Sequence, residues 1–189
     1  QALRGDPPKP LSASQPDATG SGKKVLLIDH EDSFVHMLAD YFRQVGATVS
    51  VTRHTHALER LKNEKFDLLV LSPGPGRPED FGISNFIGAA LEKKMPIFGV
   101  CLGVQAIGEY FGGKLGQLTQ PAHGRPSRIQ TRGGTLMRNL PNEIVIGRYH
   151  SLFVAPDGMP DVLTVTGTTE DGVPMTIEHK TLPVGGVQF

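Results

Sequence analysis

The chain has 189 residues, a length that predicts a single domain able to bury a core of its own. Its 19 Lys and Arg residues balance its 19 Asp and Glu residues, so charge gives no sign of a nucleic-acid or membrane partner. The single cysteine excludes a disulfide framework and a cysteine-based zinc site, and suits a reducing cytosol. No apolar run approaches the roughly 20 residues of a membrane helix.

The first residues differ in composition from the rest. Residues 1–22 are rich in Pro, Gly, Ser and Asp and have no periodic apolar pattern, so we interpret them as a linker or disordered tail. The chain starts at Gln1 and not at a methionine, which suggests that it was cut from a longer protein. The folded domain is predicted to span residues 23–189.

Buried strands and helices alternate over the first part of this domain. Strands are expected at 23–29, 48–52, 66–72 and 95–100, and helices at 33–45, 58–65, 83–94 and 105–111. This alternation predicts βαβ units and a mostly parallel α/β sheet flanked by helices. Such sheets place their sites at the carboxyl ends of strands, so Asp29, residues 73–76 and Cys101 are expected on one rim.

After Gly113 the pattern changes to short β-type runs separated by Gly and Pro. These runs occupy residues 127–130, 135–137, 143–146, 152–154, 162–166, 175–178 and 184–189. They predict a smaller antiparallel portion together with strands that return to the sheet.

Cys101 lies in the turn between a predicted strand and a predicted helix. Gly99 and Gly103 flank it in a G-x-C-x-G pattern, which is typical of a sharp turn that holds a nucleophile at the edge of a sheet. The helix N-terminus favours the thiolate, so we expect Cys101 to react near neutral pH. The alternative for a lone cysteine is a small buried core residue.

Two further features surround this turn. In Ser72-Pro-Gly-Pro-Gly76 the glycines lack a Cβ, so the Gly76 N–H and the Leu102 N–H could form a two-donor pocket for an oxyanion. Gln105 lies one helical turn after Cys101, where its amide could reach a substrate near the sulfur. A plain turn and a solvated glutamine are the alternatives.

Taken together, these motifs resemble the class I, triad-type glutamine amidotransferases over residues 25–189. The matching segments are residues 27–34, 72–76, 99–105, 123–124 and 149–152. The sequence is most similar to the glutaminase components of anthranilate synthases, particularly the fused form in which a synthase domain comes first.

The resemblance implies a flavodoxin-like fold and assigns roles to individual residues. Cys101 would be the nucleophile, and Gly76 and Leu102 would supply the oxyanion hole. Substrate contacts are implied for Gly74, Pro75, Gly76, Gln105, Ser151 and Leu152.

The resemblance also implies the activity and the partners. The domain would release ammonia from L-glutamine for a synthase acting on chorismate in tryptophan biosynthesis. We expect a synthase domain, fused N-terminally, in a cytoplasmic and oligomeric parent protein, and neither nucleic acid nor membrane as partner. We expect no cofactor or metal in this domain, and Mg²⁺ only in the synthase.

Two positions depart from the family pattern. The family's final strand continues Val-Gln-Phe-His-Pro-Glu, with histidine as the base and glutamate orienting it, whereas this sequence stops at Phe189. The Cys-His-Glu triad is therefore incomplete here, the family's last helix is absent, and the chain by itself is expected to be catalytically impaired. None of the seven histidines offers a clear substitute base, and His150 is the first to test. His30 stands where the family more often has asparagine.

Three other functions stay open. The glutaminase of an aminodeoxychorismate or phenazine-type synthase would carry the same motifs. The chain as it stands could instead be a non-catalytic module that docks on a synthase. The last alternative is an unrelated cysteine hydrolase or a flavodoxin-like redox module on the same kind of sheet.

Overall fold

A computed structural model of the protein describes residues 18–189. Its strands are β1 (Lys24–Asp29), β2 (Thr48–Arg53), β3 (Leu68–Leu71), β4 (Ile97–Val100), β5 (Leu115–Thr131), β6 (Glu143–Val154), β7 (Leu163–Thr169), β8 (Pro174–His179) and β9 (Val184–Val187). Its helices are α1 (Val35–Gln44), α2 (His54–Asn63), the 3-10 helix η1 (Pro78–Phe81), α3 (Ile83–Glu92) and α4 (Leu102–Tyr110). Within residues 18–189 none of these helices is both long enough and apolar enough to cross a membrane.

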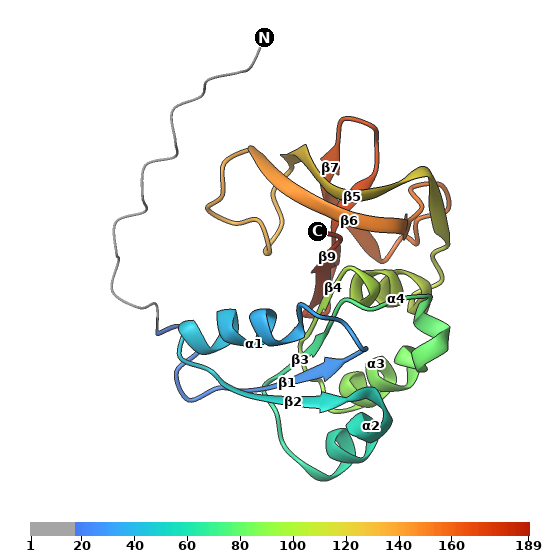
Figure 1. The fold of residues 1–189 in the computed structure, drawn as a ribbon. Coiled ribbons are helices and arrows are strands. Elements are labelled where there is room, and N and C mark those ends of the chain that lie inside the picture. The colour runs from blue at the N-terminus through green and yellow to red at the C-terminus, as the bar shows by residue number, and fades with distance from the viewer. Residues whose placement is uncertain (1–17) are drawn as a thin grey trace.

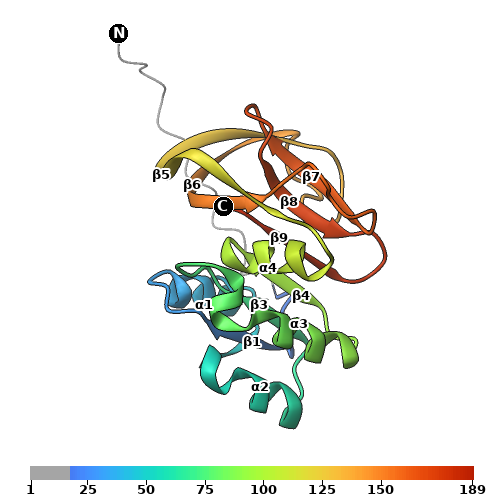
Figure 2. The ribbon, with the colours of Figure 1, turned by 90° about the vertical axis from the view of Figure 1, so that its right-hand side faces the viewer.

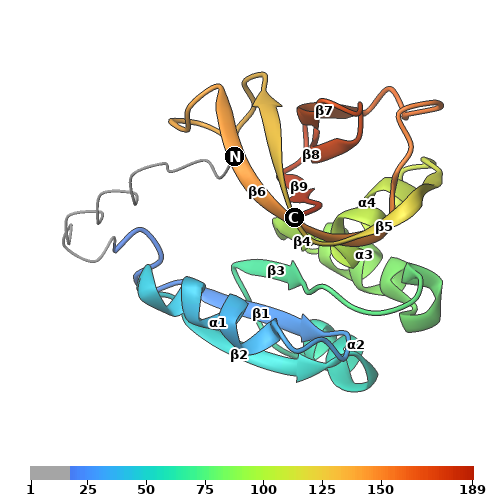
Figure 3. The same ribbon diagram turned by 45° about the horizontal axis from the view of Figure 1, so that its top comes forward.

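The strands form one sheet in the order β2-β1-β3-β4-β9-β8-β7-β5-β6. The first five strands of this order pair in parallel, and the remaining pairs are antiparallel (Figure 1). The predicted α/β class, with a mostly parallel sheet and a smaller antiparallel portion, is confirmed. The last strand, β9, lies between β4 and β8 in the middle of the sheet (Figure 3).

The parallel part is covered on both faces. Leu26 and Ile28 of β1 pack in the cluster that contains residues of α2, α3 and α4, while Val25 and Leu27 pack against α1. Figure 1 shows α1 and α2 on opposite sides of β1 and β2. Burial on both faces explains why the inner strands β1 and β3 are continuous apolar runs without alternation.

The antiparallel part differs in detail from the sequence prediction. The runs at 143–146 and 152–154 belong to one strand, β6, and the run at 135–137 lies in a turn. Most of β5 was not predicted because Pro and Gly interrupt its apolar pattern; its pairing with β6 shifts register between Gln117 and Ala122 and between His123 and Arg125. Figure 2 shows these strands beyond α4, away from α2.

Two helices begin earlier than predicted. α2 starts at His54 directly after β2, and α4 starts at Leu102 directly after Cys101. The predicted linker falls mostly on residues 1–17, which lie outside the described residues. The end of the predicted linker is described: residues 19–22 form a turn in which the Gly20 N–H donates to the Val45 carbonyl at 2.8 Å.

Candidate functional site

Cys101 occupies a strained turn between β4 and α4. Its backbone has φ +52° and ψ −104°, a region that residues with a side chain rarely adopt. The Cys101 N–H donates to the Val187 carbonyl of β9 at 2.8 Å. A Cβ added to Gly99 would lie 2.4 Å from the Gly103 backbone, and one added to Gly103 would lie 2.4 Å from the Leu71 carbonyl oxygen. Both flanking glycines are therefore needed for α4 to pack this closely on the sheet.

The thiol of Cys101 is largely buried. Burial raises its pKa to about 11; the Leu102 N–H and the Gln188 amide act in the opposite direction, and the charge of Asp32 adds to the increase. The Gln188 Nε2 lies 3.4 Å from Sγ as a donor. This pKa differs from our expectation of a thiolate near neutrality, because loss of hydration outweighs the N–H groups at the helix start.

The raised pKa of Cys101 predicts slow alkylation at neutral pH. At pH 7 a thiol with this pKa is ionised to about one part in ten thousand, and the thiolate increases about tenfold per pH unit until the pKa is approached. We expect the rate of Cys101 alkylation by iodoacetamide to rise steadily from pH 7 to 10. Gln188→Leu removes a donor to sulfur, so it should raise the pKa further and slow the reaction at each pH.

Gln44→Leu is the matched control, because Gln44 is exposed at the end of α1 and should leave the rate unchanged. The rates are followed by mass spectrometry of the modified chain. If the alkylation rate of the unmodified chain levels off near pH 8.5, as it does for an exposed cysteine, the result would contradict the burial of the Cys101 thiol.

A cavity of about 240 Å³ opens beside the thiol. It is lined by Gly74, Gly76, Cys101, Gln105, Pro121, Ala122, His123, Tyr149, His150, Ser151 and Leu152. Most of the predicted site residues therefore meet at one place, from the ends of β3 and β4 and from β6. Of the other two, Pro75 is exposed between the loop glycines, and Leu102 has a buried side chain while its N–H faces the cysteine.

Gln105 links three elements next to the thiol. Its Nε2 donates to the Leu152 carbonyl at 2.9 Å and to Gln188 Oε1 at 3.2 Å. Both N–H groups of this amide are thus bound within the protein. Gln105 lies where the sequence placed it, and in this structure it ties α4 to β6 and β9.

The loop after β3 requires glycine at position 76. Gly76 has φ +71°, and an added Cβ would lie 2.5 Å from Asp80 Oδ2. The same carboxylate oxygen accepts the Arg77 N–H at 2.7 Å. Asp80 therefore fixes the end of the loop that contains Gly76, the predicted oxyanion donor.

His150 also lines the cavity, but its ring is engaged elsewhere. Arg148 Nε donates to His150 Nε2 at 3.2 Å, and because arginine only donates, the ring proton is on Nδ1, which lies 2.9 Å from the Leu152 carbonyl. Burial lowers the pKa of His150, and the charge of Arg148 lowers it further. His150 therefore holds Leu152 in place and is poorly suited to take the proton of Cys101.

The sequence predicted no role for three residues at the site: His123 and Tyr149, which line the cavity, and Gln188, which contacts the thiol but is not part of the lining. His123 and Tyr149 form an edge-on ring pair with centroids 5.5 Å apart, and Gln188 contacts the thiol. His123 and Tyr149 stood in motifs that carried no assigned chemistry. The position of Gln188 follows from the pairing of β9 with β4, which the sequence did not predict.

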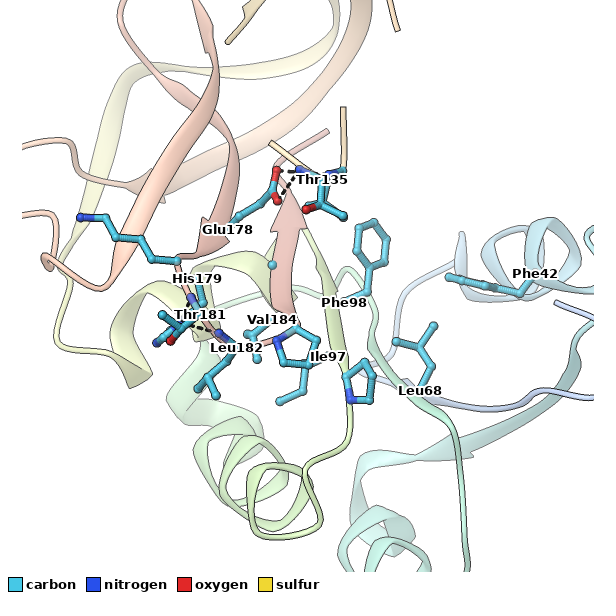
Figure 4. A pocket seen from close by; sticks show the side chains of 15 residues that line it. Phe42, Leu68, Ile97, Phe98, Thr135, Glu178, His179, Thr181, Leu182 and Val184 are labelled. Atoms are coloured by element: carbon cyan, nitrogen blue, oxygen red, sulfur yellow. Dashed lines mark hydrogen bonds between the residues drawn. The ribbon is translucent and has the colours of Figure 1, made fainter. Parts of the chain in front are cut away.

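A larger cavity of about 750 Å³ lies at the opposite edge of the sheet, where β4 and β9 begin (Figure 4). Phe98, Ile97 and Val184 contribute to its mostly apolar wall, and Glu178 accepts the Thr135 N–H there at 2.7 Å. The lining contains neither Cys101 nor any residue of the loop after β3, so this cavity is separate from the thiol site.

The fold and the cysteine site define a glutamine amidotransferase of class I: residues 26–189 match the model of the family described as "Glutamine amidotransferase class-I", and the chain belongs to this family. Membership excludes the unrelated hydrolase and redox alternatives. The chain is 52% identical over 170 residues to a protein named anthranilate synthase from Azospirillum brasilense, covering 90% of this chain and 23% of that protein. It is 40% identical over 166 residues to aminodeoxychorismate/anthranilate synthase component 2 of Bacillus subtilis, covering 87% of this chain and 86% of that protein.

Among solved structures, a glutamine amidotransferase of Thermotoga maritima has a similar fold. The TM-score is 0.71 at 20% sequence identity, with 88% of this chain and 75% of that chain covered. At this identity the likeness supports the fold alone.

Proposed function

We propose that this domain releases ammonia from L-glutamine for an anthranilate synthase that acts on chorismate in tryptophan biosynthesis. The observation that carries the proposal is the strained turn that places Cys101 beside Gly76, Ser151 and Leu152 in one cavity. The names of the two relatives support the choice of synthase.

In the proposed reaction, the sulfur of Cys101 attacks the side-chain amide carbon of glutamine. The Gly76 and Leu102 N–H groups stabilise the resulting oxyanion, and Gly74, Pro75, Gln105, Ser151 and Leu152 position the substrate. Collapse of the tetrahedral intermediate breaks the C–N bond, and the nitrogen leaves as ammonia after it gains a proton. Water then hydrolyses the thioester to glutamate and restores the thiol.

The raised pKa of Cys101 means that this reaction needs a base. In the register of β4 with β9, Val100 pairs with Val187, so residues that follow Val187 run beside Cys101. We propose that the histidine and glutamate of the family motif act from immediately after Phe189, and that the triad is incomplete in residues 1–189. The engaged ring of His150 supports this assignment.

The function is tested with two chains: residues 1–189, and the same chain extended past Phe189 by the family's His-Pro-Glu sequence and last helix. We expect the extended chain to hydrolyse glutamine at least about 1,000-fold faster, because the base also protonates the leaving group. Ammonia and glutamate release are measured at saturating glutamine, with and without the synthase partner.

Covalent labelling by a glutamine-like diazo-ketone is the second measurement. It should modify Cys101 of the extended chain and be prevented by glutamine. Equal rates for the two chains would place the base within residues 1–189. Absence of both turnover and labelling in the extended chain would overturn the proposed function.

The partner and setting are part of the proposal. We propose a chorismate-using synthase joined to the N-terminal side, an oligomeric and cytoplasmic assembly, and thiol chemistry without a cofactor in this domain, with Mg²⁺ belonging to the synthase. Because the Bacillus subtilis relative is named for two synthases, an aminodeoxychorismate synthase is the second candidate partner. Analysis of the product formed with chorismate distinguishes the two.

A further inference from the structure

His30 is a buried histidine that the proposed reaction does not use. It follows β1 directly and is fully enclosed beneath the loop after β3. The site residues Gly74 and Gly76 belong to that loop, so the contacts of His30 with it bear on the site.

The hydrogen bonds of His30 fix the position of its ring proton. Its backbone N–H donates to Ser72 Oγ at 3.0 Å, and its Nδ1 lies 3.2 Å from the Ser72 carbonyl oxygen and 3.1 Å from Ser72 Oγ. The Ser72 hydroxyl donates to the Pro73 carbonyl at 2.7 Å. A carbonyl oxygen only accepts, and the hydroxyl proton is already used, so Nδ1 carries the proton and donates.

The other side of the ring is apolar. His30 packs edge-on against Phe81 with ring centroids 5.4 Å apart, and its buried Nε2 has no hydrogen-bond partner among residues 18–189. Burial lowers the pKa of His30 to about 4, so the ring is neutral at physiological pH. His30 thus acts as a neutral donor through one nitrogen only.

The loop also rests directly on His30. A Cβ added to Gly74 would lie 2.8 Å from the His30 Cβ and 2.8 Å from its carbonyl oxygen. Hydrogen bonds therefore hold the first residue of the loop, while direct packing limits the path of Gly74. Asp80 fixes the other end of the loop through the Arg77 N–H.

We propose that His30 is a positioning residue, whose Nδ1–H holds the loop of residues 72–76 so that the Gly76 N–H faces the cavity of Cys101. This inference rests on the proposed function. Movement of the loop by about 1 Å would weaken stabilisation of the oxyanion while leaving glutamine binding largely unchanged.

Three variants of the extended chain separate the effect of the Nδ1–H donor on kcat from the effect of the ring's volume. In His30→Asn the side-chain amide places an N–H close to the position of the His30 Nδ1. In His30→Gln the longer side chain places its amide near the position of Nε2 instead. His30→Leu has no side-chain donor. We expect His30→Asn to keep kcat for glutamine hydrolysis within about threefold, and the other two to lose about 10- to 100-fold with KM unchanged.

The thermal midpoints of the variants supply the control. If the His30 ring only fills space, Leu and Gln should replace it better than the smaller Asn, as judged by both the thermal midpoint and kcat. The positioning role predicts the opposite order for kcat. Full kcat in His30→Leu, or equal losses in all three variants, would overturn the inference while leaving the proposed function intact.

A spectroscopic measurement tests the hydrogen bond without any activity. Long-range ¹⁵N NMR of the histidine rings in the unmodified chain should show His30 neutral with the proton on Nδ1. A proton on Nε2 would overturn the inference. Absence of turnover in the unmodified extended chain, with the Nδ1–H form present, would instead count against the proposed function.

Discussion

Replacing Cys101 by serine in the extended chain is expected to lower glutamine hydrolysis by at least about 1,000-fold. A serine hydroxyl is a much weaker nucleophile than a thiolate, and the base proposed to follow Phe189 would have to act on a far weaker acid. Synthesis from added ammonium by the proposed partner synthase should be unchanged, because ammonium replaces the product of the thiol-dependent step. Hydrolysis that stays within tenfold of the original rate would show that Cys101 is not the nucleophile.

Cys101→Gly provides the matched variant for this experiment. Glycine adopts a φ of +52° without the strain that a side chain adds, which is about 1–3 kcal/mol at such positions. We therefore expect this variant to be inactive but more resistant to urea than the original chain. An inactive variant with higher stability would separate loss of the nucleophile from loss of the fold.

Gly103→Ala is expected to destabilise the domain by about 3 kcal/mol or more. The new methyl group would lie 2.4 Å from the carbonyl oxygen and 2.7 Å from the Cβ of Leu71, and these belong to a central strand that cannot move aside. α4 would have to shift away from β3, and Cys101 at its start would move with it. Urea unfolding followed by circular dichroism gives the change in the free energy of unfolding.

Gly88→Ala is the control for this substitution. Gly88 also lies in a helix, α3, but the nearest atom to an added Cβ is the Tyr110 hydroxyl at 3.7 Å. Here alanine should stabilise the domain by about 0.5–1 kcal/mol, because it favours the helix more than glycine does. The two substitutions should thus have opposite signs, and equal destabilisation would contradict the packing described at Gly103.

The parallel half of the fold could be predicted because local signals agree there. The strand that begins at Lys24 is a continuous apolar run covered on both faces, and Gly46 marks the end of the helix that follows. The antiparallel half was harder to predict from the sequence, since Pro121 and Gly124 interrupt the apolar pattern of β5 where its register shifts. Strand bulges depend on the partner strand, which composition alone does not reveal.

The grouping of the candidate site residues was more predictable than the pKa of the cysteine among them. The glycines around Cys101 indicated the turn, and the structure places this turn beside the loop that ends at Gly76. The pKa of the thiol could not be predicted, because it depends on how many atoms from distant segments exclude water from the sulfur. The contact of Gln188 with Cys101 was also missed, because the two residues are 87 positions apart in the sequence and only the tertiary fold brings them together.

The central place of β9 in the sheet has a consequence for the order of folding. Within residues 18–189 the parallel and antiparallel strands are joined by strand pairing only through β9, which is the last of the described strands to leave the ribosome. Until it is made, β4 and β8 both present unpaired edges, which are prone to pair with other chains. The carbonyl of Val187 that accepts the Cys101 N–H also arrives with it, so Cys101 gains its final backbone geometry in the closing step of assembly. An unfinished chain would therefore carry the cysteine without a formed site around it.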